Sequence, residues 1–423
     1  MQIIPTIIAL WIIALTTLFF DVPEVQPAEI IGKWNLTELR KPPAMRWVNQ
    51  SGAVHSLLYS GEKFQGKDTE VFAFYASPAT LGQAKSDAKF PGVVLIHGGG
   101  GTAFAEWTFL WAQRGYAAIA MDLSGSRTID PIYDTSGVPV PNQAAKADGR
   151  NRLPNGGPVL AHPEIFDSIG GDVSDDWPYH AAASVILAHS LLRSFSEVIA
   201  GRTAVTGISW GGYTTCLVAS LDDRFRAAVP VYGCGFLFDG ESVQKPSIDK
   251  LGERREAWIK AYDPSSLLPN CRVPILFVNG TNDIHYPLDS YQKSFDAVPS
   301  PKQIRIEVNM RHGHHAGWTP PEIGLFIDSF CREGKPLPTL GKLETSGDRV
   351  RLPYTCVVPL KTAMLHYTTD TGLRSKRVWK ALPAKIGSDA VTSPTPPADA
   401  NTWFISVTDE REAMITSTVQ FQP

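Results

Sequence analysis

A glycine-flanked serine at the end of an apolar run constrains the fold of this chain most strongly. The run from Thr203 to Ile208 is rich in β-branched residues and ends in Gly207-Ile208-Ser209-Trp210-Gly211, after which a helical spacing begins. Glycines let the backbone turn sharply and let neighbouring segments approach closely. The pattern therefore predicts a tight strand-to-helix turn that exposes the Ser209 hydroxyl to a base and to a substrate. A plain glycine-rich turn can carry the same five residues, so other segments have to support this interpretation.

A second apolar strand, from Pro91 to Ile96, leads into His97 and the glycines 98–101. Glycines at this point let backbone N–H groups approach a carbonyl oxygen on which negative charge develops during acyl transfer. We expect oxyanion donors from Gly99 or Gly100 and from Trp210. The simpler role for His97 is to close this loop by hydrogen bonding.

Two further segments supply an acid and a base behind strands of their own. The apolar run from Val273 to Asn279 is followed by Asp283, and the alternating run from Gln303 to Met310 is followed by His312. In a parallel sheet, groups that follow the strands meet at one edge. The order Ser209, Asp283, His312 therefore predicts a nucleophile, an orienting acid and a general base. Asp283 could instead serve only as a turn former.

The histidines around the predicted base leave alternatives open. His314 or His315 could be a surface residue, and either could replace His312 as the base. The cluster could also bind zinc together with Asp283 and His285, but its spacing matches no known ligand pattern. We expect neither a metal nor a cofactor.

Four motifs carry a resemblance that covers Pro91 to about Pro338. There the chain resembles the α/β-hydrolase superfamily, in the bacterial branch of acetyl xylan esterases, dienelactone hydrolases and prolyl oligopeptidase catalytic domains. The motifs are His97-Gly98-Gly99-Gly100, Gly207-Ile208-Ser209-Trp210-Gly211-Gly212, Gly280-Thr281-Asn282-Asp283 and Met310-Arg311-His312-Gly313-His314. The resemblance implies an α/β fold with a doubly wound, mostly parallel sheet.

The resemblance also implies a serine carboxylic ester hydrolase that acts through an acyl-serine. Short-chain esters, or acetyl esters of carbohydrates, are the expected substrates. A secreted serine peptidase is one alternative, although the N-terminal segment and the first oxyanion strand are separated by only about sixty residues, which are too few for a propeller. The other alternative is a non-catalytic carbohydrate-binding protein on a hydrolase fold.

The chain divides by pattern into three parts. Residues 1–28 read as a signal peptide or membrane anchor, residues 29–338 as the catalytic domain, and residues 339–423 as a small β-sandwich. The sandwich is predicted from short β-type runs, with Ser388 to Ala400 as a loop because it contains three prolines and little hydrophobicity. Within the catalytic domain, residues from about 124 to 175 form a long insertion that we predict to be a lid.

Aromatic residues near the predicted lid have two interpretations. Trp107, Trp177 and Tyr179 could form a platform that stacks on sugar rings, or they could simply anchor the core and the loops.

Composition limits the partners and the compartment. The net charge is −3, with both signs mixed along the chain, which gives no reason to expect nucleic acid. The partner expected is therefore a small-molecule or carbohydrate ester, and the N-terminal segment predicts export, either to the periplasm or outside the cell, with membrane anchoring as an option. Five cysteines are too few for a disulfide scaffold, and Cys216 fits a buried core position.

Overall fold

The fold is described from a computed structural model, which covers residues 29–85, 87–141, 150–161 and 164–422. The predicted signal peptide or anchor, residues 1–28, lies outside these ranges. Parts of the predicted lid, residues 142–149 and 162–163, lie outside them as well. Within the described residues no helix is both long and apolar enough to cross a membrane.

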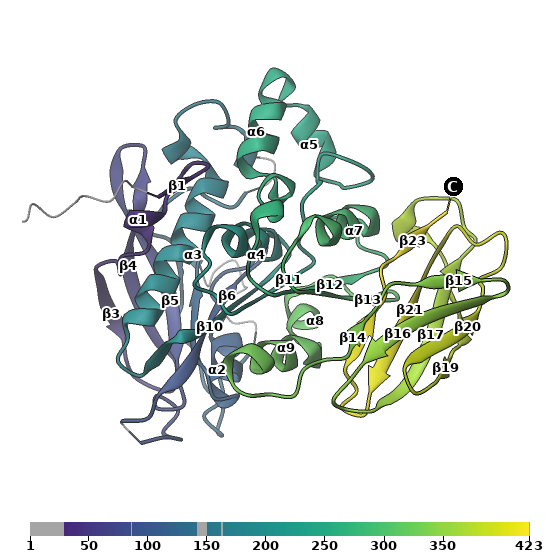
Figure 1. The fold of residues 1–423 in the computed structure, drawn as a ribbon. Helices are drawn as coiled ribbons and strands as arrows, with labels where there is room; N and C mark the ends of the chain where they lie inside the picture. The colour runs from purple at the N-terminus through teal and green to yellow at the C-terminus, as the bar shows by residue number, and fades with distance from the viewer. Residues whose placement is uncertain (1–28, 86, 142–149, 162–163, 423) are drawn as a thin grey trace, which may run out of the picture.

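A nine-stranded sheet forms the centre of the molecule (Figure 1). Its first six strands run parallel to one another, and the remaining three are antiparallel. In spatial order the strands are β13 (Lys302–Glu307), β12 (Ile275–Gly280), β11 (Ala227–Val231), β10 (Val198–Ile208), β6 (Phe90–Ile96), β7 (Ala117–Met121), β5 (Lys67–Ala76), β4 (His55–Phe64) and β3 (Met45–Asn49). Four of the parallel strands, β6, β7, β11 and β12, are entirely buried, which explains their continuous apolar sequences.

Helices cover both faces of this sheet. In Figure 1, α3 (Trp177–Ser194), α4 (Trp210–Leu221) and α7 (Leu288–Ala297) cover one face of the sheet, and α2 (Ala105–Gln113) and α9 (Pro321–Cys331) cover the other. Strands and helices alternate along the chain, as expected for parallel strands joined by crossovers. The predicted α/β-hydrolase architecture is confirmed.

Shorter elements complete the catalytic part of the chain. Near the N-terminus and around the lid they are β1 (Ile30–Ile31), β2 (Trp34–Asn35), α1 (Leu36–Leu39), β8 (Ser126–Thr128) and β9 (Arg150–Arg152). Between β11 and α9 they are α5 (Lys245–Asp249), α6 (Arg255–Tyr262) and α8 (His314–Trp318), with single 3₁₀ turns between them.

The C-terminal residues form two five-stranded antiparallel sheets. One sheet holds β14 (Thr339–Leu340), β15 (Glu344–Ser346), β16 (Arg349–Thr355), β19 (Lys385–Ile386) and β20 (Ala390–Pro394). The other holds β17 (Leu360–Thr368), β18 (Lys380–Pro383), β21 (Thr402–Asp409), β22 (Met414–Thr416) and β23 (Gln420–Phe421). One apolar cluster, including Leu352, Leu365 and Ile405, is shared by the two sheets, so they form a small sandwich.

The prediction that Ser388 to Ala400 is a loop is wrong in part. Strand β20 lies inside this segment, between β16 and β19, and it buries Ala390, Val391 and Ser393. The prolines in this segment argued against a strand. Pro394 stands at the end of the strand, however, where its missing N–H does not interrupt the backbone hydrogen bonds of the sheet.

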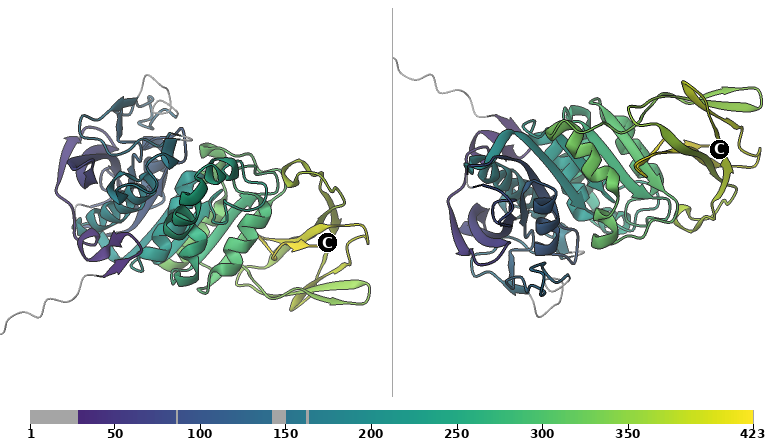
Figure 2. Two further views of the ribbon diagram at one scale, coloured as in Figure 1. Left: turned by 90° about the horizontal axis from the view of Figure 1, so that it is seen from above. Right: turned by 90° about the horizontal axis from the view of Figure 1, so that it is seen from below.

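The sandwich packs firmly on the edge of the central sheet. Ile415 and Val419 belong to the main hydrophobic core, and the Thr416 hydroxyl donates a hydrogen bond of 3.1 Å to the Ile304 carbonyl of β13. Figure 2 shows this arrangement from two further sides, with the sandwich next to the green end of the sheet. All five cysteines lie in the described part of the chain as free thiols, and only Cys356 is exposed.

Candidate active site

Ser209 occupies a strained turn between β10 and α4. Its backbone angles are φ 59° and ψ −117°, a conformation that residues other than glycine rarely adopt. The Ser209 N–H donates to the Val231 carbonyl at 2.8 Å, which ties the turn to the neighbouring strand β11. Close packing holds the turn from below, because a Cβ at Gly211 would lie only 2.1 Å from the Ile96 carbonyl oxygen. Strain of this kind persists only where the surroundings enforce it.

The structure brings Asp283 and His312 together. His312 Nδ1 and Asp283 Oδ2 are 2.7 Å apart, although the two residues are 29 positions apart along the chain. The other carboxylate oxygen of Asp283 accepts the backbone N–H groups of His285 at 2.8 Å and Tyr286 at 2.9 Å. Asp283 is almost fully buried, so these hydrogen bonds fix both its position and that of the imidazole.

Tyr232, which no sequence motif indicated, directly follows β11. Its ring stacks on His312 with 4.5 Å between centroids, and its hydroxyl donates to the Arg311 carbonyl at 2.6 Å. The preceding residue, Val231, accepts the Ser209 N–H. Tyr232 therefore holds the histidine loop against the strand that also holds the serine. The only sequence feature that could have identified Tyr232 as a site residue is its place at the carboxyl end of a predicted parallel strand.

The glycine loop after β6 lies directly against the serine. A Cβ at Gly98 would come within 2.9 Å of Ser209 Cβ, and one at Gly99 within 3.0 Å of the Trp210 ring. Trp210 is the first residue of α4, where backbone N–H groups point out of the helix end. The predicted oxyanion residues Gly99, Gly100 and Trp210 are thus gathered beside Ser209.

Hydrogen bonds within the loop separate its glycines into two groups. The Gly98 N–H donates to His314 Nε2 at 3.0 Å, and the Gly101 N–H donates to the Gly98 carbonyl at 3.1 Å. The N–H groups of Gly99 and Gly100 have no partner among the described residues. His97 closes the loop: its Nε2 accepts the Leu123 N–H and its Nδ1 pairs with the Gly98 carbonyl, both at 2.8 Å.

His314 has a different environment from His312. Burial is the main cause that lowers the pKa of His314 to about 3, and the nearby His97, His312 and His315 contribute to the same shift. Its ring packs against Phe104 with centroids 4.8 Å apart. The Asp283 carboxylate pairs with His312, so the acid and the more exposed imidazole form one unit while His314 supports the glycine loop. Among the described residues no group of three or more His, Cys, Asp or Glu side chains is arranged to hold a metal ion.

Trp107, Trp177 and Tyr179 do not form the sugar platform that the sequence left open. Trp107 and Trp177 are each only 2% exposed, and Trp177 donates its indole N–H to the Leu123 carbonyl at 2.8 Å. The half-buried Tyr179 donates to Glu62 at 2.6 Å. The alternative interpretation, that these rings anchor the core and loops, is correct.

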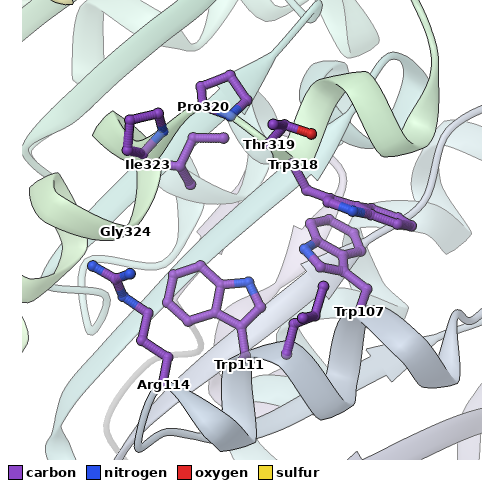
Figure 3. Close-up of a pocket in the computed structure, with 10 residues that line it drawn as sticks. Trp107, Trp111, Arg114, Trp318, Thr319, Pro320, Ile323 and Gly324 are labelled. Carbon is purple, nitrogen blue, oxygen red and sulfur yellow. The ribbon is translucent and has the colours of Figure 1, made fainter. Parts of the chain in front are cut away.

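Aromatic residues instead line a groove between α2 and the α8–α9 connection (Figure 3). Trp107 and Trp318 stack there with centroids 5.0 Å apart, above a cavity of about 240 Å³. Trp318 also contacts Phe104, which packs on His314, so aromatic contacts connect the groove wall with the histidine that supports the glycine loop.

Comparisons with known proteins agree with this architecture. A model of the dienelactone hydrolase family matches residues 78–316. Among solved structures, the acetyl xylan esterase from Paenibacillus sp. R4 is similar at 20% identity with a TM-score of 0.51, over 70% of this chain and 92% of that chain. Acetyl xylan esterase 1 from Thermoanaerobacterium sp. JW/SL YS485 is similar at 16% identity with a TM-score of 0.51, over 69% of this chain and 92% of that chain.

The comparison with curated proteins returned no match. The structural likenesses concern the fold, whereas the family match spans more than half of the chain and includes the elbow, the acid and the histidine. The chain belongs to the dienelactone hydrolase family.

Proposed function

We propose that the protein is a serine-dependent carboxylic ester hydrolase that acts through an acyl-serine intermediate. The observation that carries the proposal is the 2.7 Å contact between His312 and Asp283 at the sheet edge that also bears the strained Ser209. A serine hydroxyl is a weak nucleophile, and an imidazole oriented by a carboxylate is the usual means of activating it.

In the first half of the reaction, His312 takes the proton from Ser209 as the hydroxyl oxygen attacks the ester carbonyl. Asp283 holds the imidazole through Nδ1, which leaves Nε2 to accept that proton. The carbonyl oxygen acquires negative charge, which the N–H groups of Trp210 and of Gly99 or Gly100 stabilise. The protonated His312 then gives its proton to the departing alcohol.

In the second half, His312 activates a water molecule that attacks the acyl-serine. The same oxyanion donors stabilise the second tetrahedral intermediate, and Ser209 leaves with the proton that His312 returns to it. Every step uses side chains and backbone groups of this chain.

We propose acetyl or other short acyl esters, carried by a carbohydrate, as the substrate class. The Trp210 ring reaches across to the glycine loop, and Trp177 and Phe166 pack against it with centroids 5.6 and 6.5 Å away. These rings narrow the space beside the nucleophile, which favours a small acyl group. The acetyl xylan esterases with the same fold support this choice.

The test compares the protein with its Ser209→Ala variant on p-nitrophenyl acetate, butyrate and octanoate and on acetylated xylan. We expect acetate esters to be cleaved fastest, acetate to be released from xylan, and turnover to fall by about 10⁴-fold or more in the variant. Undiminished ester turnover in Ser209→Ala would exclude the mechanism. Faster cleavage of fluorogenic peptides than of any ester would indicate the peptidase alternative, and no labelling of Ser209 by a fluorophosphonate would indicate a non-catalytic protein.

We also propose that the protein is exported. The support is the apolar N-terminal sequence, Ile3 to Phe20, which is typical of a signal peptide. Sequencing the N-terminus of protein recovered from the periplasm or medium tests this. A mature chain that still begins with Met1 in the membrane fraction would show an anchor instead.

A further inference from the structure

Tyr286 is a fully buried tyrosine whose hydroxyl makes no hydrogen bond of standard geometry with any described residue. Leaving a buried hydroxyl unpaired destabilises a fold. Other buried tyrosines nearby avoid this: Tyr213 donates to the Tyr262 carbonyl at 2.6 Å, and Tyr291 donates to the Val278 carbonyl at 2.7 Å. The unpaired hydroxyl of Tyr286 therefore calls for an explanation other than packing.

The backbone of Tyr286 belongs to the loop that carries the predicted acid. Its N–H donates to Asp283 Oδ1 at 2.9 Å, and its carbonyl accepts the Asn279 side-chain amide at 2.8 Å. Its ring lies parallel to that of His312, with an interplanar angle of 3° and 6.4 Å between centroids. The ring is thus fixed relative to both the acid and the base.

The Tyr286 hydroxyl also interacts with the Ser209 side chain. Burial is the main cause that raises the pKa of Tyr286 well above its usual range, and Cys234 and Asp283 contribute to the rise. Hydrogen bonding from Ser209 lowers this pKa. The two hydroxyls therefore lie close together, in an arrangement that falls short of standard hydrogen-bond geometry. Hydrogen bonds at an active site are often long before substrate binds and shorten during the reaction.

We propose that Tyr286 is a positioning residue that donates a hydrogen bond to Ser209 Oγ during the reaction. This inference rests on the proposed function, because it assigns the hydroxyl to the nucleophile of that mechanism. With Tyr286 donating to one lone pair of Oγ, the Ser209 proton is directed toward His312. The tyrosine keeps its own proton throughout, since ionisation at a buried site is strongly disfavoured.

The same hydrogen bond assists the second half of the reaction. When water attacks the acyl-serine, the bond between the acyl carbon and Oγ breaks and Oγ takes the electron pair. His312 supplies the proton to Oγ, and the Tyr286 O–H stabilises the negative charge that develops before the proton arrives. Tyr286 thus acts on the leaving oxygen, whereas the glycine loop acts on the carbonyl oxygen.

The experiment uses Tyr286→Phe, which removes only the hydroxyl, and Tyr291→Phe as the matched control. For Tyr286→Phe we expect kcat for p-nitrophenyl acetate and the fluorophosphonate labelling rate of Ser209 to fall about ten- to hundred-fold, with KM within about twofold. Its Tm should stay equal or rise, because an unpaired buried hydroxyl is lost. For Tyr291→Phe we expect the opposite result, a lower Tm with kcat unchanged, because its hydroxyl is hydrogen bonded away from Ser209.

The outcomes separate this inference from the proposed function. If wild-type Ser209 is labelled and Tyr286→Phe is labelled at the same rate, Tyr286 only fills space and the inference is overturned while the function stands. A loss of activity together with a lower Tm and a changed KM would also overturn it, since that combination indicates structural damage. If wild-type Ser209 is not labelled at all, the proposed function fails and the inference fails with it.

Discussion

At the scale of single residues, the site separates two histidines, of which the sequence favoured His312 as the base and left His314 as an alternative. His312 and His314 are two positions apart, yet one pairs with Asp283 and the other accepts the Gly98 N–H. The sequence predicted that a histidine and an acid would meet at the sheet edge. Which histidine meets the acid depends on the conformation of the loop after β13. That conformation cannot be predicted from the residue pattern.

Replacing each histidine by glutamine tests this separation. His312→Gln removes the proposed base, so we expect ester turnover to fall by about 10⁴-fold or more. In His314→Gln the side-chain oxygen can still accept the Gly98 N–H, so turnover at pH 7 should stay within about tenfold of wild type. Steady-state rates with p-nitrophenyl acetate give the answer, and the reverse order of losses would make His314 the base.

Replacing the acid by its amide tests the orienting role. Asp283→Asn keeps the size of the side chain but can present an N–H to His312 Nδ1, which favours the wrong tautomer. We expect kcat to fall by about 10⁴-fold. Circular dichroism of the variant checks that the fold is kept, and a loss of less than about tenfold in a folded variant would contradict the assignment.

His314 also affects stability in acid. Its folded-state pKa of about 3 lies below its usual value of 6.5, so the unfolded chain binds more protons between these two pH values. Stability therefore falls as the pH drops from 6.5 toward 3. We expect the Tm of His314→Gln to decline less than that of wild type between pH 7 and pH 4. Equal declines in the two proteins, measured by differential scanning calorimetry, would contradict this.

At the scale of elements, the elbow depends on helix α4 approaching β6 and β11 without side chains between them. This part of the fold was predictable, because the glycines, the apolar strands and the helix start coincide within a short stretch of sequence. Strand β20 was not predictable, because neighbours on both sides stabilise a polar, proline-containing segment. The contacts of Tyr232 and Tyr286 were equally hidden, since each joins elements that are far apart in sequence.

Alanine substitutions at two glycines test the close approach at the elbow. The Gly211→Ala methyl would lie 2.1 Å from the Ile96 carbonyl oxygen, so helix and strand must move apart. We expect the free energy of unfolding to drop by about 3 kcal/mol and ester turnover to be lost. Gly201, in β10, has open space around its Cβ position, so Gly201→Ala should change stability by less than about 0.5 kcal/mol. Urea denaturation measures both, and equal stability of the two variants would refute the argument.

At the scale of the whole molecule, the sandwich and the catalytic part share one hydrophobic core. Phe404, Ile415 and Val419 belong to the main core, and Met414 donates its backbone N–H to Glu322 of α9 at 2.5 Å. The sequence predicted a separate sandwich from its strand pattern, but not this fusion, because apolar residues do not indicate which surface they will cover. The sandwich thus supports the edge strand of the catalytic sheet.

A pair of serine substitutions distinguishes a supporting sandwich from an independent module. Ile415 is 2% exposed in the shared core, so Ile415→Ser should cost about 3 kcal/mol of stability and lower the temperature at which ester turnover is lost. Val357 is 61% exposed on the sandwich, and Val357→Ser should leave both quantities unchanged. If activity in Ile415→Ser survives heating as in wild type, the catalytic sheet does not depend on the sandwich.

The backbone of Ser209 has a consequence for how such a protein can change over generations. Its positive φ costs about 1–3 kcal/mol, and glycine is the residue that would remove this cost. Selection for thermal stability alone would therefore favour the change Ser209→Gly, which removes the proposed nucleophile. Serine at this site is expected to survive only while the lineage still needs the reaction, so descendants relieved of that need should lose it early and become more stable as they do.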